Sequence, residues 1–174
     1  ITSENTKTIR DLVENAGREY GDRIYLRYEE NDVVYEVSYK QFAAECMAIA
    51  AWTAEQSRQA GHTVHVGLMG SSSHHYLAVP LDIQVNLDTF CDCLTRSDVD
   101  VLFYDWEHRP LVDGAMERCP GIRTYISLQH GRHVPCSDNI LKEYAGRSVH
   151  PDIDINALAM ILFTSGTTGR GKGV

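Results

Sequence analysis

The chain has 174 residues, of which 43% are hydrophobic and 23% are charged, a composition typical of a folded soluble protein. Its net charge of −8 argues against non-specific binding to nucleic acid, because a phosphate backbone attracts clustered Lys and Arg. No apolar run approaches the roughly eighteen residues needed to span a membrane, and no signal sequence opens the chain. These features predict a cytoplasmic protein without a transmembrane segment.

The first sixty residues predict two helices and a β-hairpin. Apolar spacing predicts a helix that ends near Gly21, and Ser38 has the features of a second helix N-cap, with Gln41 as its capping-box partner. Gly61 is the expected end of that second helix. The expected elements are a helix over residues 8–20, hairpin strands over 22–28 and 33–37, and a helix over 39–59.

After residue 60 the pattern alternates between strands and helices. Strands are expected over residues 63–69, 78–81, 100–104, 124–128 and 158–163. Helices are expected after the turn at 70–73, after Asn86 or Asp88, over 108–118 with Leu111, Val112, Ala115 and Met116 on the apolar face, and over 139–146. This alternation predicts an α/β layered fold with a largely parallel sheet flanked by helices, and no internal domain boundary is evident.

The segment after Met69 is short for the connection that it must make. A crossover between parallel strands needs a dozen or more residues, and only about eight precede the strand expected at 78–81. We therefore hypothesise that residues of the natural chain are missing between Tyr76 and Val79. The intact mass of the protein tests this: a mass equal to that of these 174 residues would contradict it.

Cysteine and histidine spacing does not favour a structural metal or disulfide framework. The five cysteines are an odd number without a Cys-x-x-Cys pair, which predicts reduced thiols. The pairs His62/His65 and His130/His133 have three-residue spacing, but no cysteine or carboxylate cluster accompanies them. The sequence thus predicts no metal ligands in this chain.

The last fifteen residues, MILFTSGTTGRGKGV, predict a strand followed by a phosphate-binding loop. The glycines let backbone N–H groups approach anionic oxygens, the hydroxyls add neutral donors, and Arg170 and Lys172 add charge. No carboxylate lies in this stretch, so an anion would meet only donors. The glycines are 166, 169, 171 and 173, and the hydroxyls belong to Thr164, Ser165, Thr167 and Thr168.

Two known patterns compete for this loop. The P-loop of nucleoside triphosphatases fits the spacing from Gly166 to Lys172, but it requires Ser or Thr after the lysine, where Gly173 stands. The block TSGTTG, followed by Lys-Gly, resembles the signature of the adenylate-forming superfamily of acyl- and aryl-CoA ligases, luciferases and peptide-synthetase adenylation domains. The chain departs from that signature at Gly171, where proline is the frequent residue. A third interpretation is a non-catalytic α/β binding module with an incidental Gly/Thr loop.

The adenylate-forming resemblance implies an ATP-dependent acid–thiol ligase. A small-molecule carboxylate would attack ATP to give acyl-AMP and pyrophosphate, and CoA would then accept the acyl group, with Mg²⁺ on the phosphates. The resemblance assigns phosphate binding to Thr164, Ser165, Gly166, Thr167, Thr168, Gly169 and Lys172, and leaves Arg170 at a variable position. Residues 21–39 are similar to bacterial long-chain fatty acyl-CoA ligases, which favours a fatty acid. An amino-acid-activating adenylation domain is the alternative within the superfamily.

The same resemblance implies that residues 1–174 are the amino-terminal portion of the large AMP-binding domain, cut after its phosphate loop, without the mobile carboxy-terminal domain. The superfamily's adenine motif, ribose-binding Asp, magnesium-binding Glu and late Lys have no counterparts in the sequence. We therefore expect no catalytic residue within this chain and no adenylation by the chain alone.

Overall fold

The computed structural model describes residues 1–2, 4–30, 32–70, 79–80, 86–129, 135–152, 154, 156, 161, 163–164 and 172–173. The chain divides into two compact units, one made of Ile1–Glu55 and Ile140–Ala157, the other of Gln56–Asn139 and Leu158–Val174. The sequence did not predict this division. The reason is that two boundaries fall inside helices, α2 (Tyr39–Ala60) and α5 (Ser137–Glu143), where no linker composition marks them.

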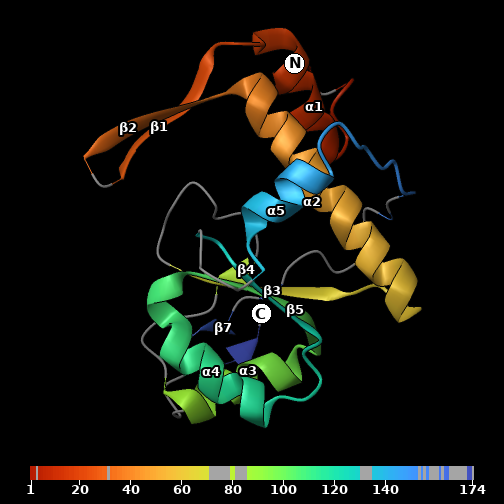
Figure 1. Ribbon diagram of the computed structural model, residues 1–174. Coiled ribbons are helices and arrows are strands. Elements are labelled where there is room, and N and C mark those ends of the chain that lie inside the picture. Colours follow the sequence, from red (N-terminus) through yellow and green to blue (C-terminus); the bar gives the residue numbers. More distant parts are fainter. Residues whose placement is uncertain are drawn as a thin grey trace. The chain divides into compact units, whose positions relative to one another are not determined.

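The first unit contains the expected helix–hairpin–helix order (Figure 1). Thr8 caps α1 (Ile9–Tyr20) in a reciprocal capping box with Asp11, and Gly21 ends the helix with a positive φ of 53°. The strands β1 (Ile24–Glu30) and β2 (Val33–Ser38) pair antiparallel. These boundaries, and those of α2, agree with the predicted ones to within one residue, except that β1 begins and ends two residues later than expected.

Aromatic side chains join the hairpin to the helices of the first unit. The Tyr39 ring lies 4.9 Å from the Tyr20 ring and 5.0 Å from the Tyr25 ring, and Tyr25 lies 4.5 Å from Phe42. Such contacts stabilise beyond the area they bury. Ser38 accepts the Gln41 N–H as predicted, but the Gln41 side chain donates to Glu45, so the predicted capping box is only half formed.

The second unit is built on a four-stranded parallel sheet in the order β4-β3-β5-β6. All six residues of the inner strand β5 are buried, as parallel strands commonly are. The sheet confirms the predicted α/β class. Its strands are β3 (His65–Met69), β4 (Val79–Pro80), β5 (Val99–Tyr104) and β6 (Thr124–Ser127).

Helices α3 (Leu87–Arg96) and α4 (Arg109–Arg118) lie together against this sheet (Figure 1). Asn86, one of the two predicted caps, accepts the Thr89 N–H. Of the apolar face predicted for α4, Val112 and Ala115 are fully buried, whereas Met116 is 38% exposed. The core is Met69, Phe90, Cys91, Cys93, Leu94, Val99, Leu102, Tyr104, Val112, Ala115, Cys119 and Ile122.

The predicted strand near residue 80 pairs in parallel with β3, although only the nine positions 70–78 separate the two strands. Residues 71–78 lie outside the described ranges. The helix predicted there, and the hypothesis of missing residues between Tyr76 and Val79, therefore remain predictions.

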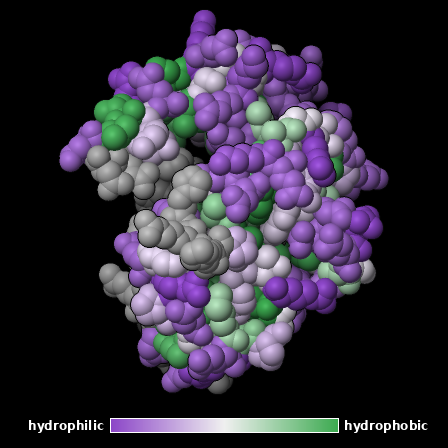
Figure 2. Space-filling model, in the orientation of Figure 1, coloured by the Kyte–Doolittle hydropathy of each residue, from purple (hydrophilic) through white to green (hydrophobic). Residues whose placement is uncertain are grey.

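The visible face of the molecule is mostly hydrophilic, with apolar residues in separate areas (Figure 2). This matches the acidic, polar composition. Among the described helices, none combines the length and the hydrophobicity required to cross a membrane.

Candidate functional site

The two ends of the predicted phosphate loop are paired strands. Phe163–Thr164 (β7) and Lys172–Gly173 (β8) form an antiparallel ladder in which Thr164 is the partner of Lys172. The sequence predicted that residues 158–163 would enter the loop as a strand of the parallel sheet. Residues 158–160 and 162 lie outside the described residues, so that strand remains a prediction, and the described pairing of β7 is the antiparallel one with β8.

Most of the predicted phosphate-binding residues lie between these two strands. Ser165, Gly166, Thr167, Thr168 and Gly169 are outside the described residues, as is Arg170. The described backbone thus brings the first and the last predicted site residues, Thr164 and Lys172, opposite each other.

A buried carboxylate lies at the carboxyl end of the parallel sheet, the edge at which α/β sheets bind ligands. Asp105 directly follows β5 and is only 3% exposed. Its N–H donates to the Met69 carbonyl, which ties the ends of β3 and β5 together. The Gln129 amide, which follows β6, donates to Asp105 Oδ1 at 3.0 Å and accepts the Trp106 N–H at 2.6 Å.

Gly70 lies against the same carboxylate. A Cβ atom at position 70 would stand 2.6 Å from Asp105 Oδ2, closer than side-chain atoms pack. Glycine is therefore required there by space and not by a positive φ. Asp105 was not among the site residues predicted from the sequence, although its position directly after the strand predicted at 100–104 could have indicated it.

The opposite end of the sheet carries a structural network. Asp100 Oδ1 lies 2.9 Å from His62 Nε2, and Asp100 Oδ2 accepts the His65 N–H at 3.0 Å. Burial tends to raise the pKa of Asp100, but these hydrogen bonds and the nearby Arg123 charge bring the pKa below its ordinary value. The pair His62/His65 thus binds Asp100 and Ser97. His130 and His133 lie outside the described residues.

The cysteines are free thiols, as predicted. Burial and the neighbouring Cys119 thiol raise the pKa of Cys91 to about 11, and burial raises the pKa of Cys46 to about 11. Thiols in this state are poor nucleophiles at neutral pH. Neither Cys46 nor Cys91 has the properties of a catalytic cysteine.

The first unit has an open groove of about 670 Å³ between α1 and α2. Its charged lining residues carry both signs: Glu14 and Asp22 are acidic, and Arg18 and Lys40 are basic. This mixed lining selects no class of ligand.

The model of the AMP-binding enzyme family matches residues 13–174 of the chain. The chain belongs to this family. The match confirms the resemblance to adenylate-forming enzymes that the TSGTTG block indicated, and it includes the whole predicted phosphate loop.

A curated relative of this AMP-binding chain is the nonribosomal peptide synthetase agiA of Aspergillus flavus. The two are 27% identical over 179 residues, an alignment that covers 96% of this chain and 2% of the relative. The chain therefore spans a small part of that protein's length.

Solved structures of similar fold include two bacterial proteins. The adenylation domain of a carboxylate reductase from Mycobacterium chelonae matches with a TM-score of 0.78 and 17% identity, over 98% of this chain and 34% of that one. A Mycobacterium tuberculosis fatty acyl CoA synthetase matches with a TM-score of 0.72 and 17% identity, over 99% of this chain and 35% of that one. These likenesses establish the fold.

Proposed function

We propose that this chain is the amino-terminal portion of the AMP-binding domain of an ATP-dependent acid–thiol ligase. In the first step a substrate carboxylate oxygen attacks the α-phosphorus of ATP, forming acyl-AMP as pyrophosphate leaves. In the second step the thiol of CoA attacks the acyl carbon and AMP leaves. The observation that carries the proposal is the family match over residues 13–174, which contains the TSGTTG block.

In this proposal the loop binds the β- and γ-phosphates through Thr164, Ser165, Gly166, Thr167, Thr168, Gly169 and Lys172. The pairing of Thr164 with Lys172 supports it, because it returns the lysine to the point where the loop begins. Donors fixed around the phosphates stabilise the charge that develops as pyrophosphate leaves. Mg²⁺ would offset the negative charge of the phosphates, and since the loop contains no carboxylate, a carboxylate that held the ion would come from outside the loop.

The proposed acyl substrate is a fatty acid, on the similarity of residues 21–39 to fatty acyl-CoA ligases. A second candidate is an amino acid, which the 27% identity to a peptide synthetase favours. Both substrates undergo the same first step, so the loop serves either one.

We also infer that residues 1–174 alone do not adenylate a carboxylate, because the sequence lacks counterparts of the adenine, ribose and magnesium motifs and of the late lysine. The cysteines, all free, support a reducing, cytoplasmic location for the protein.

The decisive experiment is ATP–pyrophosphate exchange by the full-length protein, with fatty, aromatic and amino acids, with and without Mg²⁺. Exchange that depends on one class of carboxylate and on Mg²⁺ is the expected result and identifies the substrate. Hydrolysis of ATP to ADP and phosphate, with no exchange for any acid, would indicate a P-loop type of site and contradict the proposal. If the protein showed neither exchange nor hydrolysis, the result would favour a non-catalytic binding module.

A further inference from the structure

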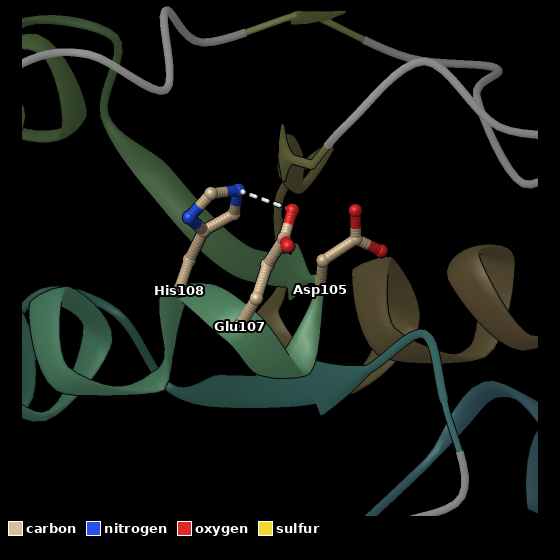
Figure 3. Close-up of side chains that lie close together, drawn as sticks. All are labelled: Asp105, Glu107 and His108. Carbon is tan, nitrogen blue, oxygen red and sulfur yellow. Dashed lines mark ion pairs between the residues drawn. The ribbon is translucent and has the colours of Figure 1, made fainter.

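We propose that Asp105, Glu107 and His108 form a binding site for a divalent transition metal ion, with Zn²⁺ as the best-fitting ion. The residues lie on the short turn from the end of β5 through the 3₁₀ helix η1 (Trp106–His108). One potential ligand atom from each residue lies within 4.8 Å of the other two. Figure 3 shows the three side chains on the same side of this turn, with the imidazole beside the Glu107 carboxylate.

The spacing of Glu107 and His108 matches two ligands of one ion. His108 Nε2 lies 3.4 Å from Glu107 Oε1. With zinc–nitrogen and zinc–oxygen bonds near 2.0–2.2 Å, two ligand atoms of a tetrahedral ion are about 3.4 Å apart. The three ligand atoms lie no more than 4.8 Å apart, so the widest separation must shorten by at most about 1.4 Å to reach that distance. The Glu107 side chain is 61% exposed and has room for that movement.

The His108 imidazole has a nitrogen, Nε2, that lies 3.4 Å from Glu107 Oε1 without forming a hydrogen bond. Nε2 is shielded from solvent and makes no hydrogen bond to any residue that the structure describes. The whole His108 side chain is only 15% exposed. A buried polar atom without a hydrogen bond is costly, and metal coordination satisfies an imidazole nitrogen.

Asp105 supplies a fixed third ligand. Its carboxylate accepts a hydrogen bond from Gln129, and because a carboxylate has about four acceptor positions, this bond leaves acceptor positions for a metal ion. Hydrogen bonds of this kind orient metal-binding carboxylates. One imidazole with two carboxylates suits Zn²⁺ or a related transition ion, whereas Mg²⁺ prefers oxygen ligands and water.

This site differs from the Mg²⁺ of the proposed function in its ligands and in its place in the sequence. It also departs from the sequence-based expectation of no metal ligands, which weighed only His62/His65 and His130/His133. The four positions from Asp105 to His108 carried no known metal motif.

The test is isothermal titration of the metal-free full-length protein with ZnCl₂, which requires neither nucleotide nor acyl substrate. We expect one zinc ion at this site, and binding at least about tenfold weaker in Glu107→Gln and in His108→Gln, since even residues that only support metal ligands contribute about 10–100-fold. Zinc should also raise the melting temperature of the wild type and not of Glu107→Gln. If His108→Gln fails to fold, Glu107→Gln carries the test, because its side chain is largely exposed.

The matched control is His150→Gln. His150 lies 3.9 Å from Glu14 and so forms a histidine–glutamate pair with a similar separation but outside the three-ligand cluster. Its removal should leave the zinc affinity unchanged. Three results would each overturn the proposal: no zinc binding by the wild type, binding by both Gln variants as tight as by the wild type, or binding that disappears only when the thiols are alkylated.

Discussion

Gln129 donates a hydrogen bond from Nε2 to Asp105 Oδ1 at 3.0 Å, across the carboxyl ends of the neighbouring strands β5 and β6. The other end of the same amide accepts the Trp106 N–H. One side chain therefore satisfies both a buried carboxylate and the first N–H of the turn that carries Glu107 and His108.

We predict that Gln129→Leu lowers the free energy of unfolding by about 1–3 kcal/mol, because it leaves buried Asp105 with one donor fewer. Urea unfolding measures the effect. Gln41→Leu is the control: the exposed Gln41 side chain donates to Glu45, the Gln41 N–H that Ser38 accepts is unchanged by the substitution, and stability should change by less than about 0.5 kcal/mol. Equal effects in the two variants would contradict the role of Gln129.

Gly70→Ala is expected to destabilise the protein by about 1–3 kcal/mol, because the new methyl group would stand 2.6 Å from Asp105 Oδ2. Gly121→Ala provides the matched control. A Cβ atom there meets nothing within 4 Å, and the residue has no positive φ. Thermal unfolding of the two variants should separate them, and a Gly70→Ala protein as stable as wild type would show that the carboxylate can move away.

Gly17→Ala tests helix packing in the first unit. Alanine favours a helix by up to about 1 kcal/mol over glycine, but its Cβ would lie 2.7 Å from Ala43 Cβ. The overlap should outweigh the propensity and give a net loss of about 1 kcal/mol or more by urea unfolding. The double variant Gly17→Ala/Ala43→Gly removes the overlap and should recover stability close to wild type. A stabilised single variant would contradict this.

The depressed pKa of Asp100 predicts a specific acid dependence of stability. The pKa of the Asp100 carboxyl group is lower in the folded state than in the unfolded state, where it is near 3.9. Such a group stabilises the protein at pH values above its unfolded pKa. The contribution is lost as the pH falls through the folded pKa. Wild type should therefore exceed Asp100→Asn in stability at pH 7, and the difference should shrink below about pH 4. Urea unfolding between pH 7 and pH 2 measures this. A stability difference that grows in acid would show that folding raises the pKa of Asp100 and does not lower it.

Lys172→Ala should lower the rate of ATP–pyrophosphate exchange by the full-length protein by about 100-fold, the effect of losing one donor that acts on developing charge. Arg170→Ala removes an equal charge two residues earlier, at the position that varies among adenylate-forming enzymes, and should exchange at nearly the wild-type rate. If the two variants were equally impaired, the loop would act through its overall charge and not through Lys172.

The sequence alone determined the elements whose signals are local. Caps and turn glycines act within one turn of helix, so Ser38, Asn86 and Gly61 marked helix ends that the structure confirms. The alternation of strands and helices was enough to predict the parallel sheet, and the TSGTTG block was enough to predict the family.

Tertiary structure alone decided the features that depend on residues far apart in the chain. No local pattern pairs Asp105 with Gln129, and none requires glycine at position 70, because both follow from which strand ends become neighbours. The exposure of Met116 was likewise undetermined, since helical spacing defines a face but not how far the neighbouring elements cover it. The division into two units, within helices, has the same origin: helix-forming sequence continues across a boundary that only long-range packing creates.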